Sequence, residues 1–146
     1  MATAEDQVRA IHKVHFARRA GEVRRCHIHK IVGEYDIAQH TFGALCLLRV
    51  LNPEPSSALF WAVTLHDLPE FITGDIPSPS KRQAWFDNEK YKEHEKEILE
   101  KYGFSWPYLT QEEEEWLNAV DSLELLSDRD WETKLVSSKV KEYRLK

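Results

Sequence analysis

Apolar residues recur along the chain at the three- and four-residue spacing of an α-helix, whereas the alternation of a half-buried β-strand is scarce. Glycine, which is common in turn-rich β proteins, is limited to 5 of 146 residues. The fold class is therefore predicted to be all-α. Helices are expected at residues 5–20, 35–51, 58–65, 81–101, 110–126 and 131–143.

Capping and breaking residues mark several helix ends. The Asn52–Pro55 segment contains two prolines and ends the second helix, because proline lacks the amide that a helix needs. Ser56 or Ser57 can accept a hydrogen bond from the first amides of the next helix. Thr110 and Glu113 have the spacing of a capping box, which predicts a helix start at that point.

Two neighbouring segments have contrasting patterns. Residues 58–65 are apolar on nearly every side, which predicts a helix in the middle of a bundle. Residues 73–80 contain two prolines and a glycine, so a shaped loop is expected there.

The composition is that of an ordinary globular protein, with 42% hydrophobic and 31% charged residues, and one domain over residues 1–146 is expected. A net charge of −5 argues against stable nucleic-acid binding. No apolar stretch is long enough to cross a membrane, and the first residues do not resemble a signal peptide. A cytoplasmic location without membrane contact is therefore expected.

The most informative feature is the dipeptide His66-Asp67 at the end of the apolar 58–65 segment. Ionisable groups at the end of a buried helix need a compensating partner, because an unpaired buried charge is costly. The dipeptide alone is also compatible with a histidine that caps a helix beside a solvated aspartate.

Two further ionisable residues lie beside predicted core positions on other helices. His40 follows Ile37 in the second helix, and Asp121 lies next to Val120 in the helix that starts near residue 110. Together with the dipeptide, they offer two imidazoles and two carboxylates from three helices. Such a set is suited to a divalent cation with open positions for water.

The order and spacing of His40, His66-Asp67 and Asp121 resemble the H…HD…D signature of the HD-domain phosphohydrolases. The resemblance implies a compact, all-helical bundle and a divalent metal ion held by these four residues. Co²⁺, Mn²⁺, Zn²⁺ and Mg²⁺ are all candidates, because a mixed shell of imidazole and carboxylate accepts several ions.

A closer resemblance is to the branch that hydrolyses deoxynucleotides, which includes bacterial 5′-deoxynucleotidases and small phage dATP triphosphohydrolases. It covers residues 25–121 and rests on further matches at Arg25, Glu70, the Thr73–Pro77 loop, Pro79 and Lys81.

The resemblance implies catalytic roles for Glu70 and Asp75, close to the reacting phosphate. On a continuing helical turn Glu70 also faces the same side as the His-Asp pair. Asp75 alternatively fits a turn aspartate that satisfies its own loop. Arg25 and Lys81 are implied to bind substrate by neutralising charge on the phosphate oxygens.

One position departs from the pattern. Cys26 stands where relatives often have a tryptophan that packs against the sugar or base, so another aromatic residue or a different substrate is required. Ile28 and Pro79 lie where relatives place apolar residues near the base. Two apolar walls favour adenine over guanine, because they leave an exocyclic amino group without a partner.

The expected substrate is a deoxynucleoside triphosphate, dATP before others, which is cleaved to the deoxynucleoside and triphosphate. The alternative is a 5′-deoxynucleotidase that acts on monophosphates. A different class of function is a non-catalytic module that binds nucleotide or protein. The resemblance also implies a homo-oligomer, for which the aromatic residues Trp85 and Trp131 could serve an interface.

Overall fold

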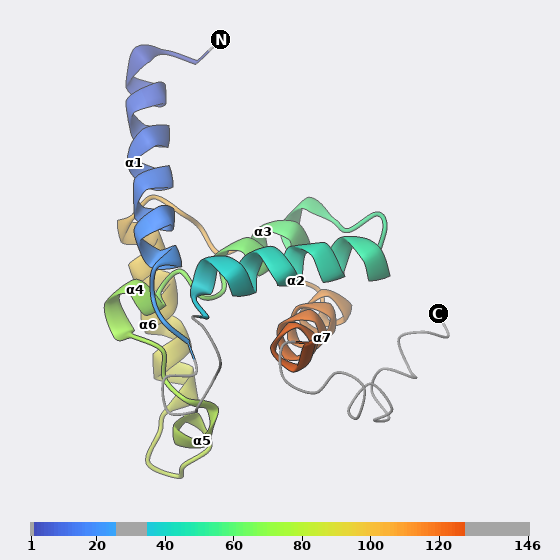
Figure 1. Ribbon diagram of the computed structural model, residues 1–146. Helices are drawn as coiled ribbons and strands as arrows, with labels where there is room; N and C mark the ends of the chain where they lie inside the picture. The colour runs from blue at the N-terminus through green and yellow to red at the C-terminus, as the bar shows by residue number, and fades with distance from the viewer. Residues whose placement is uncertain (1, 26–34, 128–146) are drawn as a thin grey trace.

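The computed structural model describes residues 2–25 and 35–127, and these residues form helices joined by short connections, with no strand among them (Figure 1). The all-α prediction is confirmed for this part of the chain. The predicted helix at 131–143, with Trp131, lies outside the described residues. The helices are α1 (Ala4–Gly21), α2 (Ile37–Leu51), α3 (Ser57–Leu65), α4 (Glu70–Thr73), α5 (Ser78–Lys81), α6 (Asn88–Lys101) and α7 (Gln111–Ser127).

The predicted caps of α3 and α7 are present and linked to each other. The Leu59 amide donates to Ser56 Oγ at 3.0 Å, and the Glu113 amide donates to Thr110 Oγ1 at 3.2 Å while the Glu113 side chain accepts from the Thr110 amide. The Ser56 hydroxyl also donates to Glu113. The N-termini of the two helices are therefore joined, which fixes α7 relative to α3 at one end.

Helix α3 lies between two groups of buried side chains and contributes to both. Leu65 packs in a cluster with Phe16 of α1 and Leu99 of α6. Leu59 and Val63 pack in a second cluster with residues of α2 and with Val120 of α7. The prediction of a central helix is thus confirmed, although Phe60 and Trp61 are about half exposed on its outer side.

The helix predicted over 81–101 begins later, at Asn88. The Asp87 side chain accepts a hydrogen bond from the Lys90 amide at 3.1 Å and caps α6 there. The preceding residues instead form the short helix α5 and a turn. Periodicity alone missed this boundary, because residues 81–87 contain no proline or glycine to mark a break.

The N-terminal turns of α1 extend beyond the other helices (Figure 1). Val8, Ile11 and Val14 on these turns are between 52% and 68% exposed. Among the described residues, no helix combines the length and the apolar character that a membrane span needs.

The start of α2 is tied to the segment that follows α1. The Arg25 amide donates to the Tyr35 carbonyl at 2.9 Å, and the Ile37 amide donates to the Val23 carbonyl at 3.0 Å. This short antiparallel bridge holds Arg25 beside the helix that carries His40.

Candidate metal centre

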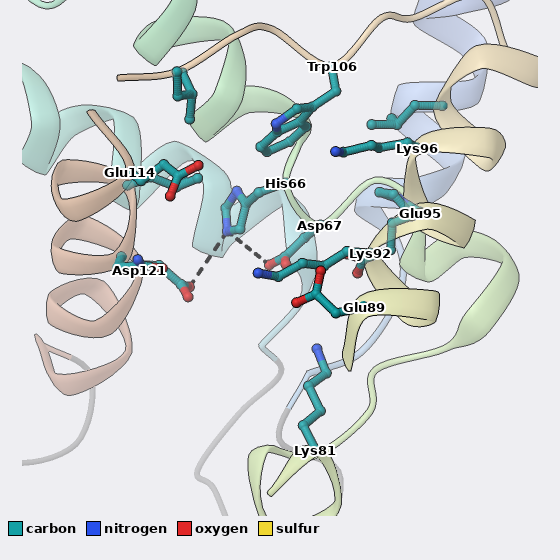
Figure 2. A pocket seen from close by; sticks show the side chains of 15 residues that line it. His66, Asp67, Lys81, Glu89, Lys92, Glu95, Lys96, Trp106, Glu114 and Asp121 are labelled. Carbon is teal, nitrogen blue, oxygen red and sulfur yellow. Dashed lines mark ion pairs between the residues drawn. The ribbon is translucent and has the colours of Figure 1, made fainter. Parts of the chain in front are cut away.

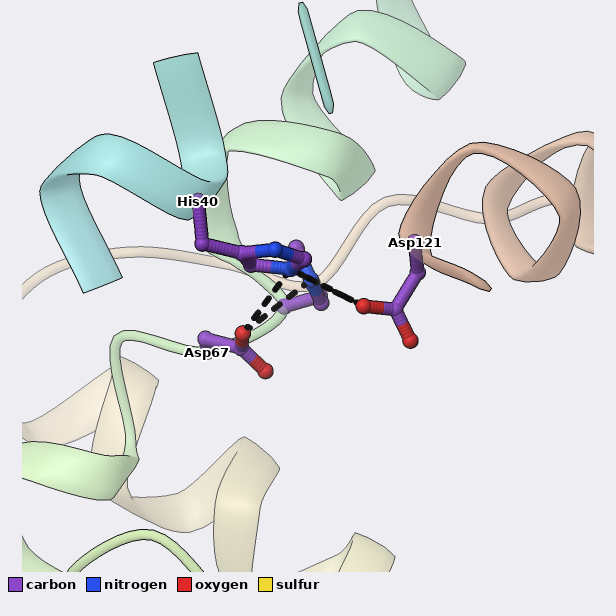
Figure 3. A group of neighbouring side chains, drawn as sticks. His40, Asp67 and Asp121 are labelled. Carbon is purple, nitrogen blue, oxygen red and sulfur yellow. Dashed lines mark hydrogen bonds and ion pairs between the residues drawn. The ribbon is translucent and has the colours of Figure 1, made fainter. Parts of the chain in front are cut away.

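Four side chains from three places in the fold lie close together, and Figure 3 shows His40, Asp67 and Asp121 among them. His40 lies in the first turn of α2 and is completely buried. His66 and Asp67 occupy the turn that directly follows α3, and Asp121 lies in α7. One ligand atom from each residue lies within 4.8 Å of all the others. The four metal ligands predicted from the sequence are thus brought together.

The distances within this group are short and similar. The Nε2 atoms of His40 and His66 lie 3.1 Å apart. His40 Nε2 lies 3.3 Å from Asp67 Oδ2 and 2.9 Å from Asp121 Oδ1. His66 Nε2 lies 3.3 Å and 3.6 Å from the same two oxygens.

This arrangement fits a divalent cation. Imidazole and carboxylate ligands bind such ions at about 2.0–2.2 Å, which places two ligands of one ion roughly 2.9–3.6 Å apart for octahedral to tetrahedral angles. The five measured distances, from 2.9 to 3.6 Å, span this interval. The donor atoms are also of the type that such ions select, since they are imidazole nitrogens and carboxylate oxygens.

The outer nitrogen of each imidazole is held by an acceptor, which frees Nε2 to act as a ligand. His66 Nδ1 donates to the Val63 carbonyl at 2.8 Å. His40 Nδ1 contacts the carboxylate of Glu124, and that carboxylate also accepts a hydrogen bond from the Tyr35 hydroxyl. A carboxylate behind a ligating histidine fixes the tautomer and the ring orientation and increases ligand basicity.

Glu124 can approach His40 because residue 43 is a glycine. A Cβ atom at Gly43 would lie 2.7 Å from Glu124 Oε1, closer than such contacts allow. Sequence reasoning missed Glu124 and Tyr35 as parts of the centre. The available signal was the position of Glu124 three residues after Asp121, which places both carboxylates on one face of α7.

The ionisation of the four ligands shows that the centre attracts positive charge. Burial opposes protonation of His66, but the charge of Asp67 and a hydrogen bond to Asp121 raise its pKa well above the ordinary value. Burial likewise opposes protonation of His40, and hydrogen bonds to Asp121 and Glu124 raise its pKa. Protonation and metal binding compete for these imidazoles, so metal binding should release the protons that they hold.

The two aspartates are held in their charged form. Burial would raise the pKa of Asp67, but the charge and hydrogen bond of His66 and the charge of Arg25 lower it to about 2. Burial would also raise the pKa of Asp121, which hydrogen bonds to His40 and His66 lower. Both carboxylates are therefore available as anionic ligands at neutral pH.

Arg25 and Glu70, for which substrate-binding and catalytic roles are predicted, lie at the edge of this group. The Arg25 guanidinium contacts Asp67 and lies 3.9 Å from both Glu70 Oε2 and Asp121 Oδ1. Among the described residues, Glu70 Oε2 is buried without a hydrogen-bond partner. Burial, followed by the charge of Asp67, raises the pKa of Glu70 to about 8.

A comparison with protein families agrees with this geometry. A family model described as "HD domain" matches residues 16–130, most of the chain, including all four ligands. The chain belongs to the HD-domain family. Membership indicates a metal-dependent phosphohydrolase and agrees with a His/Asp group that can hold the metal. Neither the curated proteins nor the solved structures contain a significant match.

The metal centre of this HD domain opens into a cavity of about 470 Å³ between α6 and α7 (Figure 2). Three of the four ligands line it, His66, Asp67 and Asp121. The opposite wall comes from α6, and Trp106 closes one end above His66. The volume suits a small-molecule ligand, which would lie directly against the metal ligands.

The other predicted site residues are placed differently. Lys81 lines the cavity. Asp75 lies in the loop after α4 and does not line the cavity, although its charge contributes to the raised pKa of Glu70. Pro79 is exposed in α5 and also lies outside the cavity lining. Cys26 and Ile28 lie outside the described residues.

Proposed function

We propose that this HD domain hydrolyses deoxynucleoside phosphates in a divalent-metal-dependent reaction, with a deoxynucleoside triphosphate as substrate. The observation that carries the proposal is the position of the ligand group, which forms part of the wall of a cavity large enough for a nucleotide. A phosphate in the cavity would therefore meet the metal ligands directly, and the remaining cavity volume would accommodate the rest of the substrate.

His40, His66, Asp67 and Asp121 would hold the ion. When bound, a divalent ion polarises a phosphate oxygen and lowers the pKa of a water ligand. The protein residues around it then orient the substrate and stabilise its charge. Fixed positive charge in such a site stabilises the charge that develops on the phosphoryl oxygens.

Arg25 is placed to contribute part of that charge. Its side chain is mostly buried and lies against the carboxylates of the centre. Burial opposes its charge, but Asp67 and Glu70 raise its pKa, so the guanidinium remains protonated. A guanidinium can bind two phosphate oxygens at once, which fixes the orientation of the phosphate.

Glu70 is proposed to exchange a proton with the reacting groups. Its raised pKa keeps a large share of the carboxyl protonated near neutral pH, which suits a proton donor to the leaving group. Asp75 is proposed to assist from the adjacent loop, where Gly74 ends α4 with a φ of 71°. Few residues other than glycine adopt that conformation without strain.

Trp106 is proposed to replace the tryptophan that this sequence lacks at position 26. Its ring lies in the cavity beside His66 (Figure 2). A flat aromatic surface at this position can pack against a sugar or base. The preference for dATP rests on the resemblance at Ile28 and Pro79 and is part of the proposal.

Hydrolysis of deoxynucleoside monophosphates is the second candidate, because it requires the same metal ligands and the same general position of the phosphate. A non-catalytic role in nucleotide or protein binding is less well supported, since no ligand of the group is missing.

A substrate panel tests the proposal. The protein is incubated with the four dNTPs and the four dNMPs, each with Co²⁺, Mn²⁺, Mg²⁺ or Zn²⁺ and each with EDTA, and products are separated by chromatography. We expect metal-dependent release of deoxynucleoside and triphosphate, fastest from dATP. Release of phosphate from monophosphates alone would select the second candidate, and no release from any substrate would refute the proposal.

A further inference from the structure

The α6 wall of the cavity carries two lysines that the sequence analysis did not assign. Lys92 and Lys96 lie four residues apart on the face of α6 that lines the cavity. Figure 2 shows both side chains directed from α6 toward His66 and Asp67, while Lys81 enters from below. Three ammonium groups from two elements thus surround the space in front of the metal ligands.

These lysines are available to a ligand. Within residues 2–25 and 35–127, neither Lys92 nor Lys96 makes an ion pair, whereas Lys90 on another face of the same helix pairs with Asp87 at 3.7 Å. Cations that converge on a cavity without a protein carboxylate as partner are suited to an anionic ligand.

Acidic side chains also line this cavity, namely Glu89, Glu95 and Glu114. Burial raises the pKa of Glu95, the glutamate next to Lys96. A higher pKa favours the neutral carboxyl and so reduces its repulsion of a bound anion. Glu114 projects from α7, on the opposite side from the lysines (Figure 2). The α6 wall therefore offers two ammonium groups to a polyanion beside two carboxyl groups, and burial favours the neutral form of one of these, Glu95.

We propose that Lys92 and Lys96 bind the part of a polyphosphate chain that extends beyond the metal-bound phosphate. This inference rests on the proposed function, and it selects a triphosphate over a monophosphate. The backbones of the two residues are separated by about 6 Å along the helix axis, so the pair can follow successive phosphates of a chain. A single phosphate at the centre would already be bound at the metal site and by Arg25. The two lysines therefore have a role only when the substrate carries further phosphates.

A pair of double variants tests this assignment. Lys92→Ala/Lys96→Ala removes both cavity charges, and Lys90→Ala/Lys101→Ala removes two charges from the same helix outside the cavity lining. Both sets are on the surface of α6, and alanine favours helix, so both proteins should fold. Binding of inorganic tripolyphosphate and of orthophosphate is measured by calorimetry with equal Mg²⁺ in cell and syringe, and KM is measured for dATP and dAMP.

We expect Lys92→Ala/Lys96→Ala to weaken tripolyphosphate binding and to raise KM for dATP by at least about 10-fold. Orthophosphate binding and any activity on dAMP should change by less than about threefold, because neither lysine is expected to contact a single phosphate. Loss of even one charge-assisted contact would have a larger effect than that. The Lys90→Ala/Lys101→Ala control should behave like the native chain.

Equal tripolyphosphate affinity and equal KM for dATP in the cavity variant and the control would overturn the assignment and leave the proposed function intact. If the native chain hydrolyses no deoxynucleotide, the proposed function fails. The calorimetric comparison then decides the lysine site alone: selective loss of tripolyphosphate binding supports it, and unchanged binding refutes it.

Discussion

Glu124 does not line the cavity between α6 and α7, yet its carboxylate orients His40 at the metal centre. It contacts both His40 Nδ1 and the Tyr35 hydroxyl, which lies 3.0 Å from Nδ1, and it is only 7% exposed. Without Glu124, His40 Nδ1 would lose its charged acceptor and retain only the weaker contact with the Tyr35 hydroxyl, so the lone pair on Nε2 would be held less firmly toward the ion. The metal affinity of the centre should therefore depend on a residue that does not touch the metal.

The corresponding prediction concerns metal affinity. Glu124→Ala should weaken Co²⁺ or Mn²⁺ binding by about 10- to 100-fold, as removal of a carboxylate behind a ligating histidine commonly does. Glu124→Gln, which retains an acceptor oxygen, should recover part of the affinity. Calorimetric titration measures both, and Glu112→Gln, an exposed glutamate of the same helix, is the control. Native affinity in Glu124→Ala would contradict the assigned role.

The raised pKa of Glu70 leads us to expect a pH dependence of stability in the metal-free protein. Its pKa rises from 4.5 to about 8 on folding, so the protonated carboxyl stabilises the fold below about pH 4.5, and this contribution is lost as the pH rises through 8. Glu70→Gln stays neutral and should therefore be more stable than the native chain above pH 8, by up to about 5 kcal/mol. The difference should vanish near pH 4.

Urea denaturation between pH 4 and 9 in EDTA measures this difference. Glu112→Gln removes a carboxylate from the exposed surface of α7 and should show a stability difference that stays nearly constant with pH. A difference for Glu70→Gln that is equally independent of pH would show that the carboxyl is not destabilised by burial.

At this scale the sequence identified the residues that carry chemistry better than those that orient them. His40 and Asp121 were recognisable because each is an ionisable group beside apolar neighbours. Tyr35 and Glu124 were not, since a tyrosine before a helix and a glutamate within one are ordinary. Only the packing of α7 against α2, with Gly43 between them, brings Glu124 to His40.

Helix α3 holds the His-Asp pair in place because it is packed on both sides. Leu59 is 1% exposed in the cluster with α2 and α7, while the adjacent Phe60 is 45% exposed. Leu59→Ala should lower the free energy of unfolding by about 2–5 kcal/mol, because it leaves a cavity in the core. Phe60→Ala should cost less than half as much. Thermal and chemical denaturation compare the two, and equal losses would contradict the described packing of α3.

Helix boundaries were predictable where the local chemistry marks them. Ser56, Thr110 and Glu113 cap α3 and α7 as expected. Their side-chain oxygens accept hydrogen bonds from backbone amides at the start of a helix, which have no partner within the helix. The start of α6 was not predictable from periodicity. Its polar sequence is compatible with a helix from residue 81, and a single aspartate at position 87 does not by itself mark a helix start.

At the scale of the whole molecule, the helices form the walls of one chemical site. Helices α2, α3 and α7 place the ligands, and α6 lies across the cavity from α7 (Figures 1 and 2). A net charge of −5 argues against an extended polyanion as partner but not against a small one, because Lys81, Lys92 and Lys96 line the same cavity. The expected homo-oligomer and the single domain over 1–146 stay predictions.

The central claim is that the His/Asp group is a metal site on which phosphate hydrolysis depends. Its most direct test is the rate of product release from dATP with saturating Co²⁺, measured for the native chain and for Asp67→Asn of similar shape, with circular dichroism to show that both are folded. The native chain should turn over dATP, EDTA should abolish this turnover, and Asp67→Asn should show none. Equal rates for the folded variant and the native chain would show that hydrolysis does not depend on this metal site.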